Sequence, residues 1–470
     1  MSLALSQEQR VIHFLNRTSF GPTPETVRQV KRLGIGSYLD QQLAPESIID
    51  SAVEARVATL KTMRMNSREL YELYPPPKVA QQQGMAMAGG MKAPRYIIYE
   101  LQQARLLRAV YSQRQLYELM VDFWNNHFNV FAAKGADRWL TTAYDRDTLR
   151  PHALGKFRDL LLATAQSPAM LFFLDNWLSA SPHGVAARLP MNARRRGINE
   201  NYAREIMELH TLGVDGGYTQ QDVREVARCF TGWTLRRPRG DAEFYFAPQL
   251  HDQGAKTVLG VRIPPGGGIE DGMKVIDLLA SHPSTAKFIA TKLARRFVAD
   301  EPPAASVERA AATFRQTDGD IRAVIRTLID SEEFFSRAAY QAKVKKPLEF
   351  TASALRLTNA EMKITPQLLR YLGRMGEPLF LAQPPTGYPD VGASWISPDM
   401  LLTRMNFASD LVNNRINGAR VELDGLLDRD SFVRLVAPNS LSQSTQTALA
   451  DIHGTDALAL LLAAPEFQRR

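Results

Sequence analysis

Helix-starting and helix-ending signals recur along most of this 470-residue chain, and they restrict its fold more than any other feature. Ser6 with Gln9 forms a capping box. Thr23 caps a second helix, Pro24 lies in its first turn, and Gly34 ends it. Apolar residues at helical spacing then predict helices over 95–131, 151–178, 199–212, 219–233, 271–298, 305–315, 319–335 and 343–358. We therefore expect a mostly α protein, a large multi-helix globular body.

Three segments depart from the helical pattern. They are 75–94, rich in Pro, Gln, Met and Gly and expected to be a flexible loop; 180–198, expected to be a basic loop; and 236–272, expected to be a β excursion. The last of these contains two strand candidates, Glu243–Ala247 and Lys256–Ile263. We therefore expect a small β-hairpin around 243–263.

No low-complexity linker divides the chain. At this length a single body can bury a large core. We therefore expect residues 1–470 to form one helical domain, with 303–470 as the C-terminal helical part of the same body.

The overall charge favours an anionic partner without identifying one. The net charge is +8, from 57 basic and 49 acidic residues, and the excess is dispersed apart from Arg194-Arg195-Arg196 and the Lys343–Lys346 region. An anionic polymer is therefore a partner to consider. We expect no nucleic acid, because the chain has no zinc finger, RNA-recognition signature or basic zipper.

Cysteine content and hydropathy bear on disulfide formation, membrane insertion and cellular location. The single cysteine, Cys229, excludes a disulfide framework, and its apolar neighbours predict a buried, inert thiol. No stretch approaches the roughly 18 apolar residues of a membrane span, so no transmembrane segment is expected. The first residues show no signal peptide. We expect the periplasm or the exterior if such a peptide was removed, and the cytoplasm otherwise.

The segment Asn199–Trp233 carries the first set of candidate site residues. Projected on an α-helix at 100° per residue, one face holds Asn201, Arg204, Glu205 and Glu208, with Thr211 beside them. His210 falls on the far side from Glu208, so the two do not form a metal pair. Glu205 and Glu208 are then either an acid/base pair or ligands to a hard cation, or members of an ion network with Arg204.

A second polar stripe follows one side of the helix predicted over 116–131. It consists of Glu118, Asp122, Asn125, Asn126 and Asn129, and aromatic residues occupy the rest of the circumference. A helix this aromatic is expected to be buried, so its stripe should meet a cleft or another polar stripe. If it meets the face of Glu205 and Glu208, the two form a pocket lined by carboxylates and amides.

A third cluster lies in the β excursion. His251-Asp252 with nearby Lys256 could transfer a proton or bind an anion. An Asx-type turn with a solvated histidine explains the same residues. The sequence leaves both interpretations open.

Several ordered motifs resemble one known family. They are Leu15–Pro22, Asp122-Phe123-Trp124 with Asn126–Phe131, Asn199–Trp233, His251-Asp252 with Gly254 and Lys256-Thr257, His282-Pro283, Lys346-Pro347 with Glu349-Phe350, Pro384–Tyr388 and Pro465–Arg470. On these the chain resembles the bacterial domain-of-unknown-function family 1800 (DUF1800). Members often look exported and are often encoded beside another exported family of phosphatase/sulfatase-like character. Asn125 stands where many relatives have His or Phe, which weakens a metal site using that position.

Two functions from different classes follow. In the first, the protein is an exported or envelope-associated hydrolase or transferase acting on a polymer through a carboxylate-lined cleft. Glu205 and Glu208 would be acid and base, and His251 and Asp252 would border the site. In the second, it is a non-catalytic binding or assembly protein working with a co-encoded exported partner. The sequence identifies no cofactor and no set of metal ligands.

Overall fold

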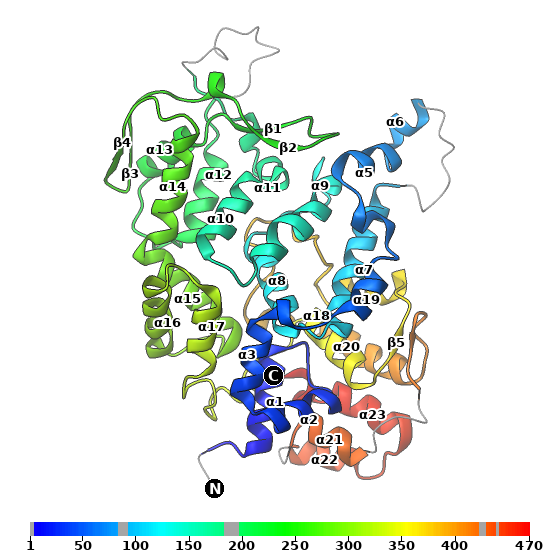
Figure 1. Ribbon diagram of the computed structural model, residues 1–470. Coiled ribbons are helices and arrows are strands. Elements are labelled where there is room, and N and C mark those ends of the chain that lie inside the picture. The colour runs from blue at the N-terminus through cyan, green and yellow to red at the C-terminus, as the bar shows by residue number, and fades with distance from the viewer. Residues whose placement is uncertain (1–3, 83–92, 183–196, 423–428, 439–440) are drawn as a thin grey trace.

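Helices make up most of the structure, which confirms the mostly α prediction (Figure 1). The computed structural model describes residues 4–82, 93–182, 197–422, 429–438 and 441–470. The first helices are α1 (Gln7–Thr18), α2 (Pro24–Leu33), α3 (Ile35–Leu43), α4 (Ser51–Val57), α5 (Ser67–Leu73), α6 (Pro77–Gln82), α7 (Arg95–Tyr111), α8 (Gln115–His127), α9 (Asp137–Ala143), α10 (Phe157–Gln166), α11 (Pro168–Phe173), α12 (Glu200–Glu205) and α13 (Gln220–Cys229). Two π-helices follow α9 and α12, namely η3 (Tyr144–Leu149) and η7 (Ile206–Thr211).

The second half of the chain is built in the same way. Its helices are α14 (Ile269–Ser281), α15 (Pro283–Phe297), α16 (Ala304–Gln316), α17 (Ile321–Ile329), α18 (Pro347–Leu357), α19 (Pro366–Arg374), α20 (Pro398–Val412), α21 (Arg429–Val436), α22 (Gln443–Leu449), α23 (Gly454–Ala463) and α24 (Pro465–Gln468). The closest helix neighbours include α15 with α16 and α20 with α23.

Local capping explains where the first helices begin and end. The Ser6 side chain accepts a hydrogen bond from the Gln9 N–H, and the Gln9 side chain bonds back to Ser6, as predicted. Thr23 caps α2 in the same reciprocal way with Thr26, and Gly34 ends that helix at a positive φ of 83°.

Several predicted long helices are pairs of shorter ones, so their predicted spans are wrong. The helix predicted over 95–131 is broken between α7 and α8, because Ser112 and the Gln113 N–H both bind the Asp50 carboxylate. The helices predicted over 151–178 and 271–298 break before Pro168 and Pro283, since the residue preceding a proline is driven to extended backbone.

The β excursion contains two hairpins rather than one. Strand β2 (Glu243–Phe246) pairs with β1 (Trp233–Arg236), although Trp233 was expected to end a helix. The predicted strand Lys256–Ile263 is itself a hairpin, β3 (Lys256–Val258) with β4 (Val261–Ile263). It turns at Leu259 and Gly260, both at positive φ, which is the geometry of a two-residue type I′ turn. A third short pair joins β5 (Glu361–Met362) to β6 (Ala419–Arg420).

The structure describes only part of the two predicted loops. Within 75–94 the segment Pro77–Gln82 is the helix α6, so the loop prediction is wrong there, and 83–92 lie outside the described residues. Of the basic segment 180–198, residues 183–196, including the three consecutive arginines, lie outside them.

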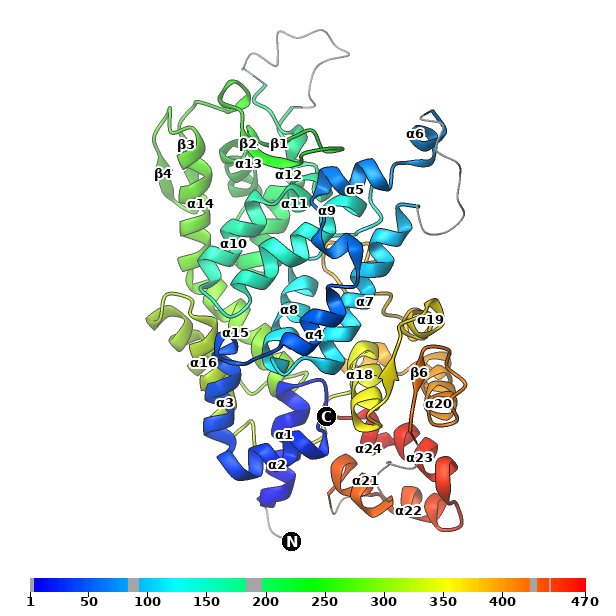
Figure 2. The same ribbon diagram turned by 45° about the vertical axis from the view of Figure 1, so that its right-hand side comes forward.

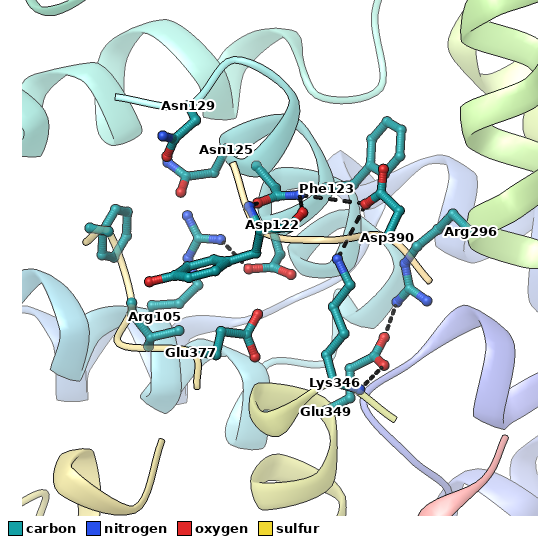
Figure 3. A pocket seen from close by; sticks show the side chains of 14 residues that line it. Arg105, Asp122, Phe123, Asn125, Asn129, Arg296, Lys346, Glu349, Glu377 and Asp390 are labelled. Atoms are coloured by element: carbon teal, nitrogen blue, oxygen red, sulfur yellow. Dashed lines mark hydrogen bonds and ion pairs between the residues drawn. The ribbon is translucent and has the colours of Figure 1, made fainter. Parts of the chain in front are cut away.

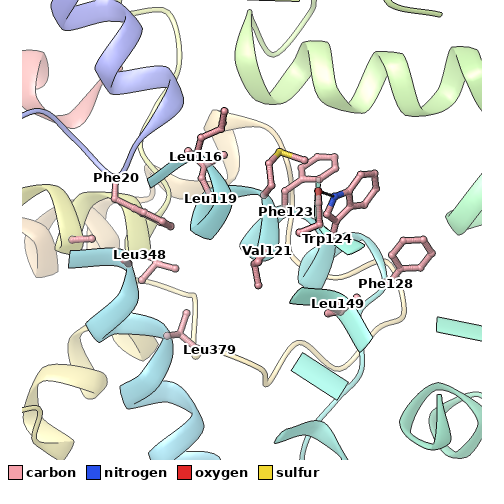
Figure 4. Packing of buried hydrophobic residues seen from close by; sticks show 14 of the residues in the cluster. Phe20, Leu116, Leu119, Val121, Phe123, Trp124, Phe128, Leu149, Leu348 and Leu379 are labelled. Carbon is pink, nitrogen blue, oxygen red and sulfur yellow. Dashed lines mark hydrogen bonds between the residues drawn. The ribbon is translucent and has the colours of Figure 1, made fainter. Parts of the chain in front are cut away.

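One cluster of buried apolar side chains extends from Val11 to Phe467. Helix α8 lies near the middle of the molecule in both views, whereas β1–β4 lie at one end and α21–α23 at the other (Figure 1, Figure 2). Apolar residues of α8, such as Leu119 and Trp124, pack among side chains from distant segments, including Phe20 and Leu348 (Figure 4). The core therefore packs against α8 on several sides, and this packing fixes the position of the polar stripe on the helix.

Candidate functional site

The polar stripe of α8 opens into a small pocket (Figure 3). The pocket is lined by Arg105, Asp122, Phe123, Asn125, Asn126, Asn129, Arg296, Lys346, Glu349, Glu377, Leu379, Phe380, Tyr388 and Asp390. The structure thus brings together the four binding residues predicted on this stripe, Asp122, Asn125, Asn126 and Asn129. The free volume is about 30 Å³. Since a buried water needs roughly 10–15 Å³, the pocket takes about two waters or one small polar group.

Two asparagines of the stripe hold one wall of the pocket in place. The Asn126 side chain donates to the Tyr388 carbonyl (2.9 Å) and accepts from the Tyr388 N–H (2.7 Å). Asn129 donates to the carbonyls of Ala382 (3.0 Å) and Pro384 (2.8 Å). These bonds fasten the segment 382–388 to α8, so Asn126 and Asn129 position the wall.

The same wall requires a glycine. Gly387 has a φ of 70°, which L side chains rarely adopt, and a Cβ there would overlap the Asn126 carbonyl oxygen. This close approach accounts for the glycine in the motif Pro384–Tyr388.

Every cation that lines the pocket is paired with a carboxylate. The pairs are Arg105 with Asp122 (2.9 Å), Lys346 with Asp390 (3.3 Å) and Arg296 with Glu349 (2.7 Å). Arg105 also binds Asp145 (2.6 Å), and Asp390 also binds Lys292 (2.8 Å). Burial alone would raise the pKa of Asp390, but Lys346 and Lys292 hold that pKa well below its ordinary value.

Glu377 differs from the other carboxyl groups of the pocket. It is 5% exposed and forms no ion pair with any residue that the structure describes; its Oε2 accepts a hydrogen bond from the Leu348 N–H (2.8 Å). Burial, and then the charge of Asp122, raise the pKa of Glu377 to about 8. The raised pKa favours the protonated form of Glu377 at pH 7, whereas Asp122 beside it forms a salt bridge with Arg105. Figure 3 shows both groups directed toward the same space.

Backbone strain marks the same pocket. Phe380 adopts a φ of 62°, a left-handed conformation that is unusual for a bulky residue. Its carbonyl accepts the Ala132 N–H (3.1 Å), and the Arg105 guanidinium lies 4.9 Å from its ring centroid. Strained residues of this kind gather at functional sites, where surrounding contacts hold them in place.

The carboxylates of the first predicted stripe lie elsewhere. Glu205 ends α12 and Glu208 lies in η7; both are partly buried, and the Tyr218 hydroxyl donates to Glu208 (3.0 Å). Burial and the nearby Glu208 charge raise the pKa of Glu205. Arg204 donates to Gln220 (2.8 Å).

The predicted place of Thr211 beside that stripe is wrong, whereas Arg204, Glu205 and Glu208 remain close enough to act on one another electrostatically. The backbone continues as a π-helix, so the angle of 100° per residue no longer applies. Thr211 is fully buried, and its hydroxyl bonds to the Ile206 carbonyl instead of lying beside Glu208. Asn201, earlier on this helix, donates to the Leu174 carbonyl (3.3 Å).

The hypothesis of a pocket shared by the two stripes is also wrong, because no residue of 199–211 lines the α8 pocket. The two segments meet through other faces. His127 of α8 hydrogen-bonds the His210 carbonyl (3.0 Å), and the two rings lie 6.1 Å apart among aromatic side chains.

The third cluster is a buried ion network. Asp271 of α14 binds both His251 (3.1 Å) and Lys256 (2.7 Å), whose side chains are 0% exposed. Asp252 binds Arg228 (3.0 Å) and accepts the Gly254 N–H (2.9 Å), which confirms the predicted Asx-type turn. The expectation of a solvated histidine is wrong, because the His251 side chain is fully buried and paired with Asp271. The idea that His251 and Lys256 face a ligand is wrong for the same reason, since both side chains are buried against Asp271.

Sequence reasoning missed Glu377, the most distinctive acid of the pocket. It also missed the partners Arg105, Lys346 and Asp390. The motifs Lys346-Pro347 and Pro384–Tyr388 marked two of the contributing segments, but no spacing in the sequence connects either of them to α8.

The described ranges hold no group of three or more His, Cys, Asp or Glu side chains that could bind a metal ion. Over these same ranges, no helix has the length and apolar character needed to cross a membrane.

Comparison with known proteins agrees with the motif resemblance. The family model described as "Protein of unknown function (DUF1800)" matches residues 13–469. No curated protein and no solved structure matches the chain. Since the family model covers nearly the whole chain, the protein belongs to the DUF1800 family.

Proposed function

We propose that this protein is a hydrolase or transferase that works by acid–base catalysis in the α8 pocket. Glu377 is the general acid and Asp122 the general base. The observation that carries the proposal is the contrast between these two carboxyl groups: Glu377 is buried without an ion-pair partner among the described residues and has a raised pKa, whereas Asp122 is paired with Arg105. Neighbouring carboxyl groups with separated proton affinities are the recurring arrangement for acid–base chemistry at neutral pH.

The proposed reaction moves one proton at each carboxyl group. Asp122 accepts a proton from the attacking water or hydroxyl group, and Glu377 donates its proton to the leaving oxygen or nitrogen. Solvent then returns a proton to Glu377 and removes one from Asp122. Arg105 fixes the orientation of Asp122.

The pocket is too small to enclose a whole substrate molecule, which favours a large substrate that enters it with one group only. Only a single small group fits inside, so the rest of the substrate lies outside the mouth, as a polymer would. Placement of this activity in the envelope or outside the cell is part of the proposal and rests on the family resemblance.

The test is an activity screen of the purified protein on cell-wall and extracellular polymers, with new chain ends as the readout. Glu377→Gln and Asp122→Asn should each lower turnover by about 10²–10⁴-fold, the usual contribution of a general acid or base. Glu208→Gln is the matched control, because it makes the same change to a carboxyl group outside the pocket, and it should retain activity. An active Glu377→Gln variant would refute the proposal. Loss of activity in Glu208→Gln alone would indicate that Glu205 and Glu208, rather than Glu377 and Asp122, are the catalytic pair.

A second candidate function is binding to a co-encoded partner, and an apolar patch on α20 favours it. Leu401, Leu402 and Met405 share one side of this helix and are 38%, 57% and 55% exposed. Light scattering of the protein mixed with the product of the neighbouring gene should show a complex that the double variant Leu402→Ser, Met405→Ser no longer forms. A mixture that stays monomeric removes this candidate.

A further inference from the structure

The charges of the α8 pocket limit the kind of group that can enter it. All three lining cations are paired with carboxylates, and Glu377 is neutral. The lining therefore carries no net charge at pH 7. An anionic group would meet Asp122 and Asp390 without finding an unpaired cation, and desolvating it there would be costly. The pocket consequently suits an uncharged polar group.

The hydrogen-bonding groups left free in the pocket define that group further. The Asn125 side chain makes no hydrogen bond with any residue that the structure describes, so both its amide donors and its oxygen are available. Asn129 donates through its nitrogen and leaves its Oδ1 as an acceptor. Neutral Glu377 offers a hydroxyl donor. A group that donates and accepts in close quarters, such as an alcohol, matches this set.

Aromatic residues lie next to these polar groups. Phe123, Phe380 and Tyr388 all line the pocket. Aromatic faces provide contact area for the C–H faces of a ring that carries hydroxyl groups. The volume of about 30 Å³ admits one hydroxyl-bearing arm while the ring itself remains at the mouth.

We infer that the α8 pocket binds a hydroxyl group of a neutral carbohydrate, and that the polymer acted on is therefore a neutral polysaccharide. This inference rests on the proposed function and specifies its substrate class. Asn125 is the residue that receives the sugar hydroxyl, with Glu377 and Asp122 next to it. The dispersed charge of +8 does not contribute to binding at this pocket, because none of the described residues that line it is an unpaired cation.

Binding is tested apart from catalysis by using the Glu377→Gln protein, which lacks the proposed acid. Calorimetry is carried out with cellohexaose and hexa-N-acetylchitohexaose as neutral probes and hexagalacturonate as the anionic counterpart. At least one neutral probe should bind with a Kd that changes less than about twofold between 50 and 500 mM NaCl, since no ion pair forms. Asn125→Ala in the same background should weaken that binding about tenfold. The matched control Asn406→Ala, at an exposed position on α20, should leave it unchanged.

The outcomes separate this inference from the proposed function. Salt-sensitive binding of hexagalacturonate, absence of binding by both neutral probes, or an unaffected Asn125→Ala variant would overturn the neutral-carbohydrate inference. Salt-independent neutral binding that depends on Asn125 supports it, even if the wild-type protein cleaves nothing. In that last case the acid–base function alone fails.

Discussion

Replacing Glu377 by Gln should remove a specific loss of stability that develops as the pH rises from 4.5 toward 8. An amide resembles the protonated acid in shape and can still accept the Leu348 N–H. The pKa of Glu377 is about 8 in the folded protein, against an ordinary value of 4.5. The unfolded chain therefore releases this proton at a lower pH than the folded protein does, so stability decreases as the pH rises from 4.5 toward 8 and changes no further above the folded pKa.

The magnitude follows from the separation of the two pKa values. A difference of about 3.5 pH units corresponds to about 5 kcal/mol, the largest loss that this one group can cause. Wild-type stability should decline over this window, whereas Glu377→Gln should lack this part of the decline. The free energy of unfolding of the variant, relative to that of the wild type, should thus increase steadily between pH 5 and pH 8.

Denaturant unfolding of both proteins at half-unit intervals from pH 5 to pH 9 measures the difference directly. A matched control is Asp122→Asn, which removes the second cause of the shift and should reduce the pH dependence without abolishing it, because burial remains. Parallel stability curves for wild type and Glu377→Gln would refute the reasoning, since they would mean that Glu377 is ionised throughout and is not a neutral acid.

Three further predictions concern the pocket and a neighbouring buried lysine. Asp390→Asn should destabilise the fold by up to about 3–5 kcal/mol in denaturant unfolding, because it leaves two largely but not fully buried lysines without their carboxylate. Gly387→Ala should displace the wall that Asn126 fastens, so polymer-cleaving activity should fall further than the melting temperature does; full activity would count against the close approach. Burial lowers the pKa of Lys345 to about 7, so Lys345→Met should stabilise the protein most below pH 7. This gain in stability should shrink as the pH rises toward 10.5, and unfolding at pH 6 and pH 9 would measure the difference.

Short-range signals predicted the helical fold well where the information is local. The caps at Ser6 and Thr23 involve residues three positions apart, so the sequence contains every atom that decides them. The break at Ser112 could not be predicted in this way, because Asp50, more than sixty residues earlier, supplies the competing hydrogen bonds. The turn at Leu259 was missed because a non-glycine residue takes the positive φ there.

In the candidate site, too, the features that depend on residues close in sequence could be predicted, whereas those that depend on distant partners could not. Most of the stripe could be predicted because Asp122, Asn125 and Asn126 share the regular helix α8; Asn129 follows just after its end at His127, and all four predicted binding residues line the pocket. The stripe at 201–208 was projected with the same rule, which misplaces Thr211 because the helix becomes a π-helix at Ile206. The network around Lys256 depended on Asp271, which belongs to a different element.

The choice between the two carboxyl pairs depends on what an acid–base pair requires. Glu205 and Glu208 follow one another on adjoining helical segments and are both partly buried, so they have similar surroundings, and the charge of Glu208 helps to raise the pKa of Glu205. Glu377 and Asp122 come from segments about 250 residues apart, and the fold gives one a buried position without a cation and the other the guanidinium of Arg105. The second arrangement sets a buried carboxyl group without a cation next to one that is paired with an arginine, which is the difference in surroundings that an acid–base pair needs. A periodic pattern in the sequence can indicate which side chains share a face, but the difference in proton affinity arises from the tertiary partners of each group, and it is this difference that makes the α8 pocket the stronger candidate.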